Sequence, residues 1–128
     1  MGRVILDSSV LIAFYDEQDA HYSSVHRQFE ERVDQYEISA LTITEVLTAP
    51  LARSSSNREK FLEAVTGGIQ AVHPVTEEIA VLAGSVRVAT GLKTPDAIIS
   101  ATATLAGATL WTLDKKLAKA HKGAVLIK

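Results

Sequence analysis

The stretch "TPDAIISATATLAGATLWTLD", residues 94–114, predicts a helix followed directly by a strand. Its proline favours a helix start, and the small apolar residues that follow favour a helix over 95–107. The short apolar run over 108–113 has the length and composition of a buried strand. The two acids of the stretch stand at its turning points, because Asp96 opens the predicted helix and Asp114 follows the predicted strand.

The rest of the chain repeats this alternation of strand and helix. Further strands are predicted at 3–7, 36–41, 67–75 and 123–127, and further helices at 8–15, 20–33, 42–53, 57–66, 76–91 and 114–121. Near-continuous apolar strands between helices are typical of a parallel sheet that is covered on both faces. We therefore expect one α/β domain over residues 1–128, with three layers (α/β/α) and a central, mostly parallel sheet of four to five strands.

Composition excludes several classes of protein. The chain has 128 residues, of which 47% are hydrophobic, as expected of a compact globular domain. It has no cysteine, so disulfides and thiolate metal sites are excluded. No signal-peptide pattern and no membrane-spanning run are present, so we expect a soluble, cytoplasmic protein. The net charge of −2 argues against binding nucleic acid through bulk charge, although local basic residues still suit a phosphate backbone.

Four acidic residues stand where a parallel sheet binds its ligands, outside the carboxyl ends of the strands. Asp7 closes the first strand, Glu45 lies just past the second, and Asp96 and Asp114 flank the fourth. Each also fits a local role. Asp7 and Asp114 suit helix N-caps, Glu45 completes a capping box with Thr42, and Asp96 suits the positive end of a helix dipole.

The two interpretations are compatible, because helices that begin at strand ends lie on one side of the sheet. Four such acids bring negative charges together, which is unfavourable unless a cation or protons compensate. Oxygen ligands without cysteine or histidine suit Mg²⁺ or Mn²⁺. The pattern therefore favours a metal site.

Three segments resemble PIN-domain ribonucleases, most closely the VapC-type toxins of bacterial toxin–antitoxin pairs. They are "VILDSSVLIAF" (4–14), "LTITEV" (41–46) and "TPDAIISATATLAGATLWTLDKKLA" (94–118). The resemblance implies a PIN-like fold and a metal-dependent endoribonuclease that hydrolyses RNA phosphodiester bonds. It assigns both catalysis and binding of Mg²⁺ or Mn²⁺ to Asp7, Glu45, Asp96 and Asp114. One departure is that "KKLAKA" lacks the further acid that family members often carry after Asp114.

Neighbouring residues extend this hypothesis. Thr112 matches a hydroxyl position that the family places beside the metal, and Ser8 and Ser9 are further candidates for aiming the carboxylates. Purely local hydrogen bonds are the alternative role for these hydroxyls. The candidates for contacting the RNA backbone are Lys115, Lys116, Lys93, Arg53 and Arg3. A solvated helix face is the alternative for each.

The resemblance also implies partners: an RNA substrate, a cognate antitoxin protein that blocks the active site, and a second copy of the chain in a homodimer. The amphipathic helices at 20–33 and 57–66 are where we expect an apolar groove. The alternatives are a housekeeping RNA-processing nuclease, a non-catalytic PIN-type binding module, and a receiver-like signalling domain. A receiver would need an acidic pair after the first strand, where "LDSS" offers one acid. The RNA target, and whether one or two metal ions bind, stay open.

Overall fold

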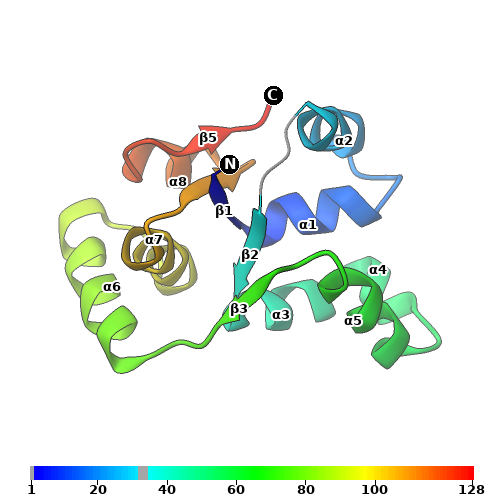
Figure 1. Ribbon diagram of the computed structural model, residues 1–128, viewed down its shortest axis with the longest axis horizontal. Helices are drawn as coiled ribbons and strands as arrows, with labels where there is room; N and C mark the ends of the chain where they lie inside the picture. Colours follow the sequence, from blue (N-terminus) through cyan, green and yellow to red (C-terminus); the bar gives the residue numbers. More distant parts are fainter. Residues whose placement is uncertain (1, 32–34) are drawn as a thin grey trace.

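The computed structural model describes residues 2–31 and 35–128, and within them five strands form one sheet. The sheet has the order β3-β2-β1-β4-β5, and every neighbouring pair is parallel (Figure 1). The strands are β1 Arg3–Leu6, β2 Gln35–Ser39, β3 Ala71–His73, β4 Thr109–Thr112 and β5 Val125–Leu126. The predicted α/β fold is confirmed. The sheet has five strands, the upper end of the predicted four to five, and it is parallel throughout.

Helices cover both faces of this sheet, which gives three layers (Figure 1). One face packs against α1, α2, α3 and α5, and the other against α6, α7 and α8. The helices are α1 Ser8–Tyr15, α2 Tyr22–Glu30, α3 Ala40–Leu47, α4 Pro50–Ser54, α5 Arg58–Thr66, α6 Glu77–Thr90, α7 Thr94–Ala106 and α8 Lys115–Ala120. No helix among the described residues is long and apolar enough to cross a membrane.

Alternate residues of the central strands serve the two cores. Leu6 of β1 and Trp111 of β4 pack into the core beneath α1 and α2, whereas Ile5 and Leu110 pack into the core beneath α6 and α7. All four are fully buried. Because successive side chains of a strand point to opposite faces, a sheet covered on both sides needs apolar residues at every position. This requirement explains the unbroken apolar strands of the sequence.

The boundaries of the second strand and the helix after it differ from the prediction. The strand ends at Ser39, whose hydroxyl oxygen accepts from Leu41 N at 3.1 Å and caps α3. Pro50 is expected to kink or end the helix predicted over 42–53; α3 ends at Leu47, and Pro50 begins a separate helix, α4. The predicted helix over 20–33 is present as α2, and residues 32 and 33 of the prediction lie outside the described residues.

A buried carboxylate links three strands on the face covered by α6 and α7. Glu37 of β2 is only 3% exposed. Arg3 of β1 donates to both of its oxygens at 2.8 Å, and His73 Nε2 donates to Oε1 at 2.6 Å. Arg3 also donates to the carbonyl oxygen of Ala106 at 2.6 Å, which ties the sheet to the end of α7. The hydrogen bonds from Arg3 outweigh the effect of burial and, with His73, lower the pKa of Glu37 to about 2.

The lowered pKa of Glu37 predicts an acid-sensitive contribution to stability. The unfolded chain takes up a proton near the usual pKa of 4.5, whereas the folded chain does so near 2. The contribution is therefore complete above pH 4.5 and is lost as the pH falls toward 2. We expect Glu37→Gln to cost about 1–3 kcal/mol at neutral pH and to remove this part of the acid dependence. Urea unfolding of both proteins across this range checks it, and parallel pH profiles would contradict it.

Candidate active site

Asp7 follows β1, and its carboxylate is held by side chains instead of capping α1. Its backbone N–H donates to the carbonyl oxygen of Trp111 at 3.0 Å, and the residue is only 5% exposed. Oδ2 accepts from Ser9 Oγ and from Thr112 Oγ1, each at 2.8 Å. Asp7 stands at the N-cap position of α1, as the sequence suggested, but its side chain makes no capping bond. Its other oxygen, Oδ1, takes no part in these two hydrogen bonds.

The two hydroxyls that hold Asp7 are themselves oriented by the turn after β4. Thr112 Oγ1 accepts from Asp114 N at 3.0 Å, and Ser9 Oγ accepts from Leu113 N at 3.2 Å. A hydroxyl that accepts from a backbone N–H turns its own proton elsewhere, here to the carboxylate. Ser9 and Thr112 therefore fix the direction of Asp7, which is the positioning role that the sequence suggested for them.

Glu45 lies in the second turn of α3 and does not form the predicted capping box. The helix begins at Ala40 and is capped by Ser39, so Thr42 is inside the helix and fully buried. Glu45 is half-buried and hydrogen bonds to Ser8. Burial raises the pKa of Glu45, and the charges of Asp7 and Asp96 raise it further. Its side chain thus faces other carboxylates instead of a cap.

The remaining two acids flank β4. Asp96 lies in the first turn of α7, where it makes no side-chain cap, and burial followed by the charges of Asp7 and Asp114 raises its pKa. Asp114 is a true N-cap of α8, because its Oδ1 accepts from Lys116 N at 2.8 Å and from Leu117 N at 3.3 Å. Capping and clustering are therefore combined at Asp114, as the sequence allowed.

Four acids from four separate segments thus influence one another, and we call them the acidic cluster: Asp7, Glu45, Asp96 and Asp114. Their donors are all carboxylate oxygens, the type that Mg²⁺ and Mn²⁺ prefer. Asp7 Oδ1 takes no part in the hydrogen bonds from Ser9 and Thr112, and Asp114 Oδ2 takes no part in the capping bonds of α8. Within residues 2–31 and 35–128, no three acid or histidine side chains already stand at the separation that one metal ion requires. The donor chemistry of the four carboxylates fits a hard cation.

The predicted basic residues are spread unevenly around this cluster. Lys116 lies close enough to Asp96 to lower its pKa, and Lys93 precedes the first turn of α7. Lys115 is exposed at the start of α8, and Arg53 is exposed on α4. Arg3 does not belong with them, because it lies at the opposite end of β1 and binds Glu37. The ion pairs of buried Glu37 with Arg3 and His73 were not predicted, although an acid inside an apolar strand indicates that a partner is needed.

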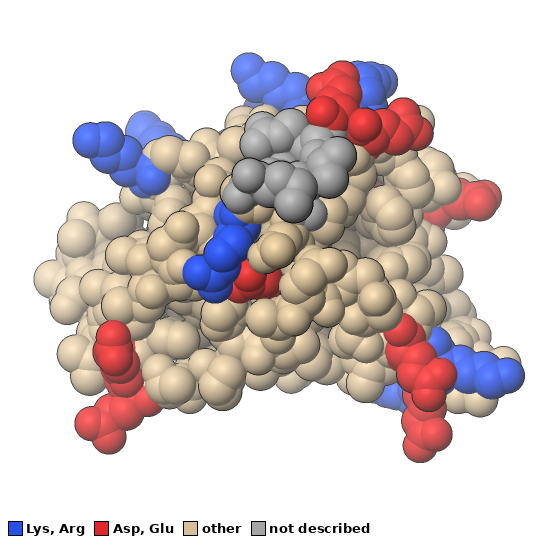
Figure 2. Space-filling view, in the orientation of Figure 1, with Lys and Arg blue, Asp and Glu red and all other residues tan. Residues whose placement is uncertain are grey.

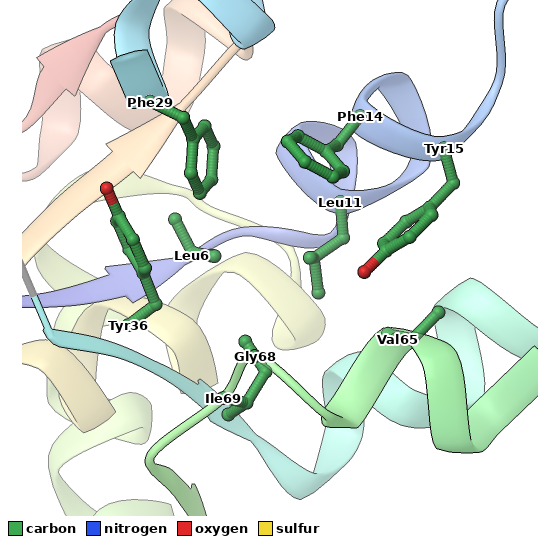
Figure 3. Close-up of a pocket in the computed structure, with 9 residues that line it drawn as sticks. All are labelled: Leu6, Leu11, Phe14, Tyr15, Phe29, Tyr36, Val65, Gly68 and Ile69. Carbon is green, nitrogen blue, oxygen red and sulfur yellow. The ribbon is translucent and has the colours of Figure 1, made fainter. Parts of the chain in front are cut away.

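An apolar pocket lies between the two amphipathic helices where the sequence predicted a groove (Figure 3). It has a volume of about 240 Å³. Aromatic side chains of α1 and α2 form one wall, and the end of α5 with the turn after it forms the other. Phe14, Tyr15, Phe29, Val65 and Ile69 are among its lining residues. The residues that line the pocket include no carboxylate, so it suits apolar side chains of another molecule.

The family model of the PIN domain matches residues 4–123, so the chain belongs to the PIN domain family. No curated protein sequence matches it. A chain of a toxin–antitoxin complex from Klebsiella pneumoniae is 25% identical, with 95% of each chain covered and a TM-score of 0.80. PAE2754 from Pyrobaculum aerophilum is 26% identical, with 97% of this chain and 88% of that chain covered and a TM-score of 0.66. VapC20 of Mycobacterium tuberculosis, a toxin that cleaves the sarcin–ricin loop, is 18% identical over 98% of each chain with a TM-score of 0.80, a likeness of fold.

The hydroxyl of Thr112 is predicted to stabilise the site and not merely to fill space. Thr112→Val keeps the shape of the side chain but leaves the Asp114 N–H without its acceptor and removes one donor from Asp7. We expect a loss of about 1–3 kcal/mol in the free energy of unfolding. Thr112→Ser, which keeps the hydroxyl, is the matched control and should lose less. Equal losses for the two variants in urea unfolding would contradict the role of the hydroxyl.

Proposed function

We propose that this chain is a single PIN domain over residues 1–128 that hydrolyses RNA as an Mg²⁺- or Mn²⁺-dependent endoribonuclease. We further propose that it is the toxin of a VapC-type toxin–antitoxin pair and acts in the cytoplasm. The observation that carries the proposal is the buried carboxylate of Asp7. It is aimed by two hydroxyls and lies among three further acids. Such an arrangement destabilises an empty fold and becomes favourable when a cation binds.

Asp7, Asp96, Asp114 and Glu45 are the proposed ligands of that cation. A bound Mg²⁺ or Mn²⁺ supplies a water of lowered pKa and neutralises charge on the phosphoryl oxygens. The chain's own contribution is to hold oxygens in place. Ser9 and Thr112 leave Asp7 Oδ1 outside their hydrogen bonds, and the N-cap of α8 does the same for Asp114 Oδ2. Ser8 positions Glu45 as a ligand or as the group that orients the attacking water.

Local basic residues are proposed to bind the RNA backbone. The protein has a net charge of −2, and acidic and basic side chains are interspersed around the rim of the face in Figure 2. Contact with phosphates therefore depends on individual side chains near the acids. Lys116 is the best placed, with Lys115 and Lys93 on adjoining helix starts and Arg53 farther along the chain on α4.

The toxin role is supported by the likeness to a toxin–antitoxin complex at 25% identity. In this chain the apolar pocket of Figure 3 is the proposed seat for apolar side chains of the antitoxin, which would reach the acids past the end of β1. A homodimer is proposed from the family resemblance. A housekeeping nuclease would have the same site but no antitoxin gene beside its own gene.

Metal-dependent cleavage of structured RNA tests the catalytic proposal. A stem-loop with the sequence of the sarcin–ricin loop is the first substrate to use. We expect wild-type cleavage with Mg²⁺ or Mn²⁺ and none with EDTA. Thr112 only positions Asp7, so Thr112→Val should lower the cleavage rate roughly 10–100-fold. Asp7→Asn and Asp96→Asn should lower the rate further. Thr112→Ser is the control for the first variant.

Two outcomes of this experiment would contradict the catalytic proposal. A wild type that cleaves none of a panel of RNAs with either metal, while Asp7→Asn folds more stably, supports a non-catalytic binding module. Cleavage that survives in both Asn variants would place the chemistry elsewhere in the chain.

A charge placed in the apolar pocket should weaken antitoxin binding without loss of catalysis. Ile69→Asp puts a charge among apolar side chains and should weaken binding of the protein encoded by the adjacent gene by about tenfold or more. Val88, which is 91% exposed on α6, gives the control Val88→Asp. Calorimetry measures the affinity, and RNA cleavage by Ile69→Asp should match that of the wild type. Equal antitoxin affinity for both variants would exclude this pocket as the antitoxin-binding site.

A further inference from the structure

Two hollows bordered by α6, α7 and α8 share lining residues and together form one groove. The first, of about 480 Å³, is lined by Thr90, Lys116, Lys119 and Ala120. The second, of about 390 Å³, shares Thr90 and Ala120 with the first and continues to Lys122. Lys116 joins this groove to the site, because its charge acts on Asp96. We call the combined surface the lysine groove.

Three lysines recur at every third position along this groove. Lys116 and Lys119 lie on α8, Lys122 follows its end, and all three are exposed. None of them forms an ion pair with an acid in the described part of the chain. Residues three apart on a helix lie about 5–6 Å from each other, so Lys116 and Lys119 form one row of positive charge. Such a row matches a ligand with repeated negative charges.

The floor of the groove is uncharged. Val86 and Ala89 of α6 contribute apolar surface, and Ser100 of α7 bonds to His121 Nδ1 at 2.6 Å. Burial lowers the pKa of His121, so its imidazole adds no positive charge at neutral pH. Apolar and hydroxyl groups below a basic edge suit a strand with a charged backbone and less polar sugars and bases.

We propose that the lysine groove binds the single-stranded RNA segment on one side of the cleaved bond, with successive backbone phosphates at Lys116, Lys119 and Lys122. This inference rests on the proposed ribonuclease function for its substrate. It adds two positioning residues, Lys119 and Lys122, and a direction in which the strand leaves the acidic cluster. A polyanion is favoured over an apolar partner, because the three lysines would have to be desolvated against the latter.

Binding of a short fluorescein-labelled single-stranded RNA in EDTA tests the groove without cleavage. The test variant is Lys119→Gln with Lys122→Gln. The control is Lys60→Gln with Lys128→Gln, which changes the net charge equally but alters α5 and the last residue of the chain. Loss of two phosphate contacts should lower the slope of log affinity against log salt by about 1.4, and weaken binding at low salt by about tenfold. The control should keep the wild-type slope.

Two outcomes would overturn the groove. One is an equal loss in both double variants, which would show that only bulk charge matters. The other is an unchanged slope with an altered oligomeric state in sedimentation, which would make the groove an interface between copies of the chain. Failure of the proposed function is distinguishable, because it appears as a wild type that binds RNA by these lysines but cleaves none with Mg²⁺ or Mn²⁺.

Discussion

The hydrogen bonds from Ser9 and Thr112 to one oxygen of Asp7 are the interaction on which the site depends. They join the end of the central strand to the turn after its neighbour, across 105 residues of sequence. Both donors are themselves held by backbone N–H groups of that turn. The direction of the carboxylate is thereby set by the backbone of the turn after β4 and not by rotamer preference alone. This rigidity leaves one oxygen of Asp7 in a fixed position among three other acids.

The parallel sheet makes this crowding unavoidable. Each strand ends at the same edge, and a helix begins soon after, so side chains at helix starts and strand ends share a small region. Burial, and then the charges of neighbouring acids, raise the pKa of Glu45 and of Asp96 in this region. Elsewhere on the same sheet, Glu37 lies with Arg3 and His73, where opposite charges lower a carboxyl pKa instead. Burial and like charges thus raise the pKa of Glu45 and Asp96, whereas opposite charges lower the pKa of Glu37.

The sequence predicted the layers, the alternation of strands and helices along the chain and the convergence of the four acids, because apolar periodicity and strand ends are local signals. It did not distinguish which acids cap helices. For Glu45 this depended on where α3 begins, because the hydroxyl of Ser39 caps the helix three residues before Thr42. The role of Glu37 was missed because its partners Arg3 and His73 lie 34 and 36 residues away. The lysine groove depends on how α6, α7 and α8 are placed around it, which no local pattern reveals.

The pairing of β1 with β4 has a consequence for synthesis of the protein. Chains emerge from the ribosome with the N-terminus first, so Asp7 is made long before Thr112, which follows it by 105 residues. Until then neither its strand partner on that side nor the hydroxyl of Thr112 exists, although that of Ser9 does. Asp96 is absent for most of that time and Asp114 for all of it. A nascent chain therefore holds scattered acids, and the complete acidic cluster exists only once nearly the whole chain has been made.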